Sequence, residues 1–105
     1  MQKKIPVITE KKETHSYLFR LYITGASPNS SRAITNIKLF FDKLLVKNYE
    51  LEIIDVYQDP SLAKQENIIA LPLLIKKHPL PERKLIGDMS DSTKLSLMLG
   101  IENNE

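Results

Sequence analysis

The fold of this chain is decided by residues 17–45, which read YLFRLYITGASPNSSRAITNIKLFFDKLL. The first seven of these residues are mostly apolar on both faces at a period of two, which predicts a central β-strand over residues 17–23. A turn begins at Gly25, after which Ser27 is a good helix N-cap and Pro28 suits the first helical position. Apolar residues then recur at helical spacing and predict an amphipathic helix of about five turns.

The rest of the chain continues this alternation of strands and helices. The expected elements are a second strand over residues 51–57, a short helix from Pro60 to about residue 67 with Asp59 as its cap, a third strand over residues 73–76, a fourth strand over residues 83–87 and a last helix capped by Ser90. A long helix joins the first two strands, which should therefore be parallel with a right-handed crossover. The last two strands are close enough in sequence for an antiparallel hairpin. The order β-α-β-α-β-β-α is that of a single thioredoxin-like α/β domain with helices on both faces of the sheet.

Length and composition define the class of protein further. The chain has 105 residues and a formal net charge of +2. This length suggests one domain, which we place at residues 16–101, between a flexible N-terminal tail at 1–15 and a C-terminal tail at 102–105. The net charge is too small to suggest nucleic-acid binding. The longest apolar run, residues 68–75, is far shorter than the roughly 20 residues that cross a membrane. We therefore expect no membrane association and a cytoplasmic protein.

The chain contains no cysteine and only two histidines. Thiol redox chemistry, a thiolate metal site and a cysteine nucleophile are therefore excluded. In a thioredoxin-like oxidoreductase, a Cys-x-x-Cys pair stands at the N-terminus of the first helix, where this chain has Ser27 and Ser30. Two serines cannot form a disulfide, and helix capping is the simpler interpretation of Ser27. We predict no catalytic residue, no metal and no cofactor.

Four blocks of the sequence resemble the KaiB family of circadian-clock proteins. They read LYITGASPNSSRA at residues 21–33, IDVYQDPSLA at 54–63, IALPL at 69–73 and LPERKLIGDMS at 80–90. The resemblance runs from about residue 17 to residue 99 without large gaps. It departs at Glu52 and Asn67, where lysines are common in the family. These departures reduce the basic character of the family's binding surface.

The resemblance implies a non-enzymatic regulatory protein. Such a protein binds a KaiC-like hexameric ATPase and modulates its phosphorylation and output state, in a circadian or a stress-related pathway. A KaiA-like protein and a sensor histidine kinase are further candidate partners, and a homo-oligomer, either a dimer or a tetramer, is expected. Two alternatives stay open: a redox-inert thioredoxin-like adaptor for a sensor histidine kinase and, more remotely, a serine-based glutathione-dependent enzyme.

The family is also known for two folds of one chain. One is the thioredoxin-like arrangement predicted above. The other is a ground state, which has the same first half and a rearranged second half. The resemblance leaves both arrangements open for this chain.

Two sets of candidate functional residues follow from the sequence and the resemblance. The polar contacts to a partner are expected from the basic residues Arg32, Lys76, Arg83 and Lys84. Residues 76–84 alone carry a local charge of +3. The second set is structural or belongs to a conformational switch, and its members are Ser27, Pro28, Pro72, Pro79, Pro81 and Gly87. Prolines are included because their uncatalysed isomerisation is slow enough to gate a rearrangement.

Overall fold

The computed structural model describes residues 17–46, 48–68 and 70–100. The elements in this part of the chain are β1 (Tyr17–Ile23), α1 (Pro28–Leu44), β2 (Tyr49–Asp55), α2 (Pro60–Gln65), β3 (Leu73–His78), β4 (Arg83–Ile86) and α3 (Ser92–Leu99). Their order confirms the predicted β-α-β-α-β-β-α arrangement. The expected tails at residues 1–15 and 102–105 lie outside the described residues.

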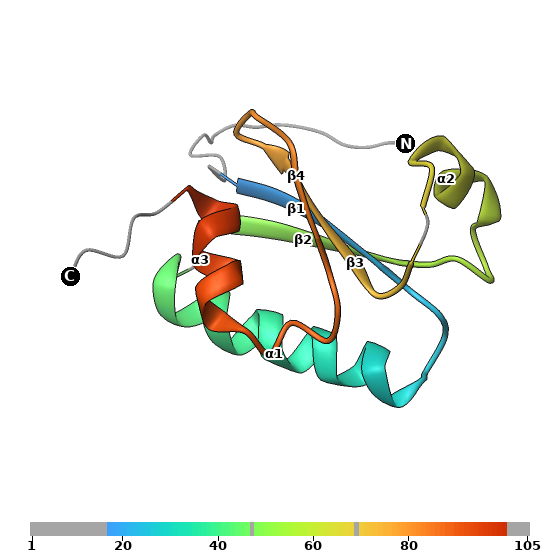
Figure 1. Cartoon of the computed structure of the whole chain (residues 1–105), viewed down its shortest axis with the longest axis horizontal. Coiled ribbons are helices and arrows are strands. Elements are labelled where there is room, and N and C mark those ends of the chain that lie inside the picture. The colour runs from blue at the N-terminus through green and yellow to red at the C-terminus, as the bar shows by residue number, and fades with distance from the viewer. Residues whose placement is uncertain (1–16, 47, 69, 101–105) are drawn as a thin grey trace, which may run out of the picture.

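The strands form one four-stranded sheet in the order β2-β1-β3-β4. β1 is parallel to β2, whereas β3 is antiparallel to both β1 and β4. The central position of β1 and the antiparallel hairpin of β3 and β4 are therefore as predicted. Figure 1 shows α3 close to one end of α1 and α2 far from both. α1 and α3 pack on one face of the sheet, and α2 packs on the other. β2 and β4 are the edges of this sheet.

Both faces of the sheet carry an apolar cluster, because the side chains of β1 alternate between them. The larger cluster joins β1, α1, β3 and α3 and contains Phe19, Leu21, Ile23, Ala33, Ile37, Phe41, Leu74, Met89, Leu95, Met98 and Leu99. The smaller cluster, on the α2 face, contains Tyr22, Ile54, Leu73 and Ile75. Within the larger cluster, the rings of Phe19 and Phe41 stack with centroids 4.3 Å apart. This stacking fixes α1 against the centre of the sheet.

The structure corrects the predicted start of the second strand. β2 begins at Tyr49, two residues before the predicted start, and ends at Asp55, two residues before the predicted end. Tyr49 pairs with Tyr17 in the parallel ladder, and its ring meets that of Phe41 edge-on at a centroid distance of 5.3 Å. The polar start of β2 thus joins the sheet with Tyr49, whose ring completes an aromatic cluster formed with residues from other elements.

One predicted helix cap is confirmed in position and one is wrong. Asp59 is the N-cap residue of α2, although its side chain makes no capping hydrogen bond. α3 begins later than predicted, and its cap is Asp91, whose Oδ1 accepts from the Lys94 amide at 3.2 Å. Ser90 instead donates its amide to Asp88 Oδ1. Ser90, Asp91 and Ser92 are all of a type that caps helices, and the capping hydrogen bond is made by Asp91.

Replacing Phe41 tests the aromatic contact between α1 and the sheet. Phe41 is fully buried, whereas Leu39, two residues earlier on the same helix, is 67% exposed. We expect Phe41→Ala to lower the free energy of unfolding by about 3–5 kcal/mol, because it removes buried surface and leaves a cavity. Leu39→Ala, the matched control, should change it by no more than about 0.5 kcal/mol. Urea unfolding followed by circular dichroism measures both, and equal losses would contradict the described packing.

Alkaline pH tests the contact between Tyr49 and α1. The Tyr49 hydroxyl donates to Asp42 Oδ1 at 2.6 Å. Partial burial, together with this hydrogen bond, raises the pKa of Tyr49 to about 12. Tyrosine in the unfolded chain ionises near pH 10, so this stabilisation is complete below about pH 10 and is lost as the pH rises towards 12. The unfolding free energy of the wild type should therefore fall more steeply over this range than that of Tyr49→Phe. Parallel curves for the two proteins would argue against the raised pKa.

Candidate functional site

The turn between β1 and α1 is held by a small group of hydroxyls. Ser27 Oγ accepts from the Ser30 amide at 3.1 Å, as the predicted N-cap should, and donates to Ser30 Oγ at 2.8 Å. Ser30 Oγ also accepts from the Thr24 amide at 3.2 Å, and Ser30 is buried. Pro28 occupies the start of α1, as predicted. The hydroxyls at the Cys-x-x-Cys position of a thioredoxin-like domain are thus engaged in shaping the turn.

Asp55, the last residue of β2, attaches this turn to the neighbouring strand. Its Oδ1 accepts from the amides of Gly25 at 3.1 Å and of Tyr57 at 2.9 Å. The carboxylate therefore bridges the end of β1 and the end of β2. This role is structural, and it positions the N-terminus of α1 relative to the sheet.

A second turn, after β4, brings together three of the predicted functional residues. The Gly87 amide donates to the Pro72 carbonyl oxygen at 3.0 Å, which joins the end of β4 to the entry of β3. Arg32 Nε lies 3.5 Å from Asp88 Oδ2, so α1 is attached to the same turn. Hydrogen bonds from Ser90 lower the pKa of Asp88, and Arg32 lowers it further. Arg32 nevertheless keeps 56% of its side chain exposed.

Arg83 and Lys84 are exposed on the edge strand β4. They line a surface hollow of about 380 Å³ between β4 and α3, together with Leu85, Lys94, Leu97 and Met98. Lys94 was not among the predicted contact residues. It joins the hollow because α3 packs beside β4, and its sequence position alone gives no signal of that neighbourhood. The hollow thus combines basic side chains with the 60% exposed Leu97.

The structure separates the four predicted basic contact residues. Lys76 is only 3% exposed and lies opposite Arg83 in the β3–β4 pair, so it does not extend the exposed basic surface. Burial lowers the pKa of Lys76, and the positive charge of Arg83 lowers it further. Arg32 is placed beyond the other end of β4, where it contacts Asp88. Only Arg83 and Lys84 remain together as an exposed pair.

Lys77 also contributes little to the predicted basic stretch. Its Nζ lies 2.8 Å from Glu66 Oε2 and 2.8 Å from Glu82 Oε2. Hydrogen bonds to these two carboxylates raise the pKa of Lys77. The sequence could not reveal this pairing, because Glu66 comes from a different element. The local positive charge is therefore smaller than the sequence suggests.

Pro79 and Pro81 lie in the connection between β3 and β4, at the opposite end of β4 from Gly87. The peptide bonds before both of them, and before Pro72, are cis. Leu80, between the two prolines, is 75% exposed. The four predicted switch residues of the second half, Pro72, Pro79, Pro81 and Gly87, are thus divided between the two ends of the hairpin. Ser27 and Pro28 lie apart from them at the start of α1.

No group of three or more histidine, cysteine, aspartate or glutamate side chains in the described part of the chain could hold a metal ion. None of the helices within it is both long and apolar enough to span a membrane.

The sequence matches known proteins over most of its length. The KaiB domain family model matches residues 20–101. The circadian clock oscillator protein KaiB of Gloeothece citriformis is 39% identical over 90 residues, which cover 86% of this chain and 85% of the relative. The protein of the same name from Synechococcus elongatus is 40% identical over 86 residues, covering 82% of this chain and 84% of the relative.

Solved structures with lower sequence identity show the fold. The N-terminal domain of Synechococcus elongatus SasA is similar with a TM-score of 0.70 at 17% identity, covering 95% of this chain and 98% of that domain. Mitochondrial thioredoxin 3 of Saccharomyces cerevisiae has a TM-score of 0.66 at 15% identity, covering 83% of this chain and 80% of that protein. The thioredoxin-like prediction is therefore confirmed. The family model and the curated relatives together establish that this chain belongs to the KaiB family.

Proposed function

We propose that this protein is a non-enzymatic regulator that binds a KaiC-like hexameric ATPase and modulates its phosphorylation and output state. The observation that carries the proposal is the KaiB domain match over residues 20–101, supported by relatives named circadian clock oscillator proteins. The pathway is circadian or stress-related, and the cytoplasm is the proposed location. A KaiA-like protein belongs to the same proposal as a further partner.

The basic hollow between β4 and α3 is the surface that we propose for this contact. Arg83 and Lys84 stand on an edge strand, and Lys94 faces the same hollow from α3. Such a surface suits an acidic region of the partner, because complementary charge steers association and suppresses wrong partners. The exposed Leu97 adds an apolar contact within the basic surround. Arg32 stays in the proposed contact set at a separate position, since more than half of its side chain is exposed.

The hydrogen bonds among the three hydroxyl side chains at the start of α1 support a binding role over a catalytic one. A serine nucleophile needs an adjacent base, and the third member of a catalytic triad orients that base. Ser27 and Ser30 instead hydrogen-bond to each other and to Thr24. This geometry gives no support to the serine-based glutathione enzyme. The family match, in turn, favours the clock regulator over the kinase adaptor.

Self-association into a dimer or tetramer is also part of the proposal. α1 and its C-terminal end carry exposed apolar side chains, among them Leu39 at 67% and Val46 at 67% exposure. Exposed apolar surface of this kind is available for contact with a second copy. These residues are separate from the basic hollow, so self-association and partner binding use different surfaces.

Charge reversal on β4 tests the proposed contact. We expect Arg83→Glu/Lys84→Glu to weaken binding to a purified KaiC-like ATPase with ATP by about tenfold or more, because attractive pairs at the interface become repulsive. The residual binding should also depend less on salt than that of the wild type. Titration followed by size-exclusion chromatography of the complex measures both effects.

Lys38→Glu/Lys43→Glu is the matched control for this experiment. It reverses the same number of charges at two exposed lysines of α1. Its binding should remain within about twofold of the wild type, because these lysines lie outside the proposed surface. Equal weakening by the two double variants would point to a general charge effect and against the β4 surface.

A further inference from the structure

α2 is weakly held by its own residues. It is only six residues long, none of them is buried, and the cap residue Asp59 makes no side-chain hydrogen bond to it. A helix this short does not persist on its own in water, so contacts with the rest of the protein must hold it in place. Within the helix, Leu62 makes the apolar contact to the sheet, because it is partly buried against the smaller cluster.

An ion pair at the C-terminal end of α2 supplies a second attachment. Glu66, the C-cap residue, has 14% of its side chain exposed. Its Oε2 lies 2.8 Å from Lys77 Nζ on β3 and 3.7 Å from Arg20 Nη1 on β1. One carboxylate of α2 thus contacts cations on two adjacent strands of the sheet.

Both cations are themselves anchored by further carboxylates. Arg20 Nε lies 2.7 Å from Glu52 Oε1 on β2, and Lys77 Nζ lies 2.8 Å from Glu82 Oε2, just before β4. We call the five residues Glu52, Arg20, Glu66, Lys77 and Glu82 the ion-pair chain. It crosses the sheet from β2 to the beginning of β4, with Glu66 at its centre. Because Arg20 and Lys77 are held in position, little side-chain freedom is lost when Glu66 joins them.

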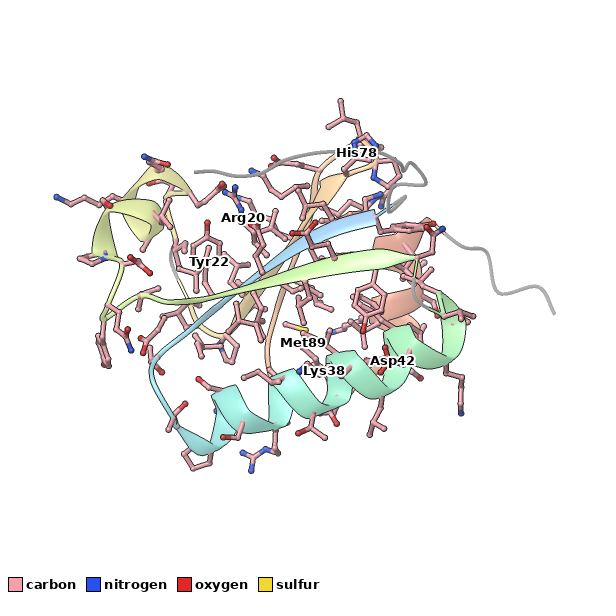
Figure 2. All side chains as sticks on the ribbon, turned by 180° about the vertical axis from the view of Figure 1, so that it is seen from behind. Arg20, Tyr22, Lys38, Asp42, His78 and Met89 are labelled. Carbon is pink, nitrogen blue, oxygen red and sulfur yellow. The ribbon has the colours of Figure 1, made fainter. Side chains whose placement is uncertain are left out.

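α2 and the segment after it lie over an apolar sheet face. Figure 2 shows Arg20 and Tyr22 on the side of β1 opposite to α1, which is the α2 side. The smaller cluster on this side is completed by Leu62, Ile68 and Leu71, which come from α2 and the residues after it. Within the described part of the chain, the buried Tyr22 hydroxyl makes no hydrogen bond of regular geometry, and its interaction is with the nearby Arg20 guanidinium. Opening of α2 would hydrate this hydroxyl, which offsets part of the cost of exposing the apolar residues.

We propose that Glu66 is an electrostatic latch, whose pairs with Arg20 and Lys77 keep residues 57–68 closed over the smaller apolar cluster. When the latch is lost, this segment opens locally and exposes the cluster, while the α1 side of the sheet stays folded. The division into two layers makes local opening feasible, because the larger cluster lies on the other face and contains no residue of α2. Local opening of weakly packed segments, separate from global unfolding, is general behaviour of proteins.

Hydrogen exchange of the full chain, followed by mass spectrometry, tests the latch in Glu66→Gln. This change keeps the shape of the side chain and removes its charge. We expect amides in residues 57–68 to exchange at least about tenfold faster than in the wild type, with the rates in α1 unchanged. Glu50→Gln, which neutralises an exposed acid of β2, is the matched control and should leave residues 57–68 unchanged. Binding of a hydrophobic dye should increase for Glu66→Gln only.

The wild-type protein provides a second test that needs no variant. Salt at about 1 M reduces the Debye length to about 3 Å and weakens ion pairs to the extent that water reaches them, as it partly reaches Arg20 and Lys77. Exchange in residues 57–68 should therefore accelerate with salt relative to α1. Unchanged exchange of this segment in both Glu66→Gln and high salt would overturn the proposal. An equal acceleration in α1 and in residues 57–68 would overturn it as well, because that result means global destabilisation.

Discussion

The structure depends on the burial of β1 between two apolar layers. β1 pairs with β2 on one side and with β3 on the other, and its side chains alternate between the two faces. Phe19, Leu21 and Ile23 face α1, whereas Tyr22 faces α2. Because the two layers share this strand, neither can form unless β1 is in the correct register. The turn hydroxyls after β1 and the carboxylate of Asp55 then set the direction in which α1 leaves the sheet.

Much of this fold could be predicted because its signals are local. Residues 17–23 show the double-faced apolar pattern of a central strand, and Ser27 with Pro28 marks the start of α1 unambiguously. The start of β2 at Tyr49 could not be predicted, because the residue belongs to the sheet through contact with Phe41 and Phe19. The predicted cap of α3 was wrong for a related reason. Adjacent Ser90 and Asp91 both suit the position, and only the folded structure shows that Asp91 caps the helix.

The candidate site was harder to predict than the fold, because the charge counted from the sequence differs from the charge that is exposed on the folded protein. Lys76 and Lys77 add equally to the positive charge counted from the sequence. In the structure, Lys76 is buried and Lys77 is paired with two carboxylates. Lys94 lies far from β4 in sequence and reaches the same hollow through the packing of α3. Periodicity places a residue on a face of its element, but the partners of that face come from other elements. The family resemblance indicated the class of function, whereas only the structure shows which side chains each basic residue contacts.

The exposed basic pair on β4 has one more consequence, which concerns aggregation. An edge strand offers unpaired backbone groups to any other strand, including the same edge of a second molecule. β4 is only four residues long, and two of those residues are Arg83 and Lys84. If two copies of β4 paired, these like charges would be brought close together at the new contact and would repel each other. The same short strand that presents positive charge outwards therefore also protects the sheet against open-ended growth through this edge.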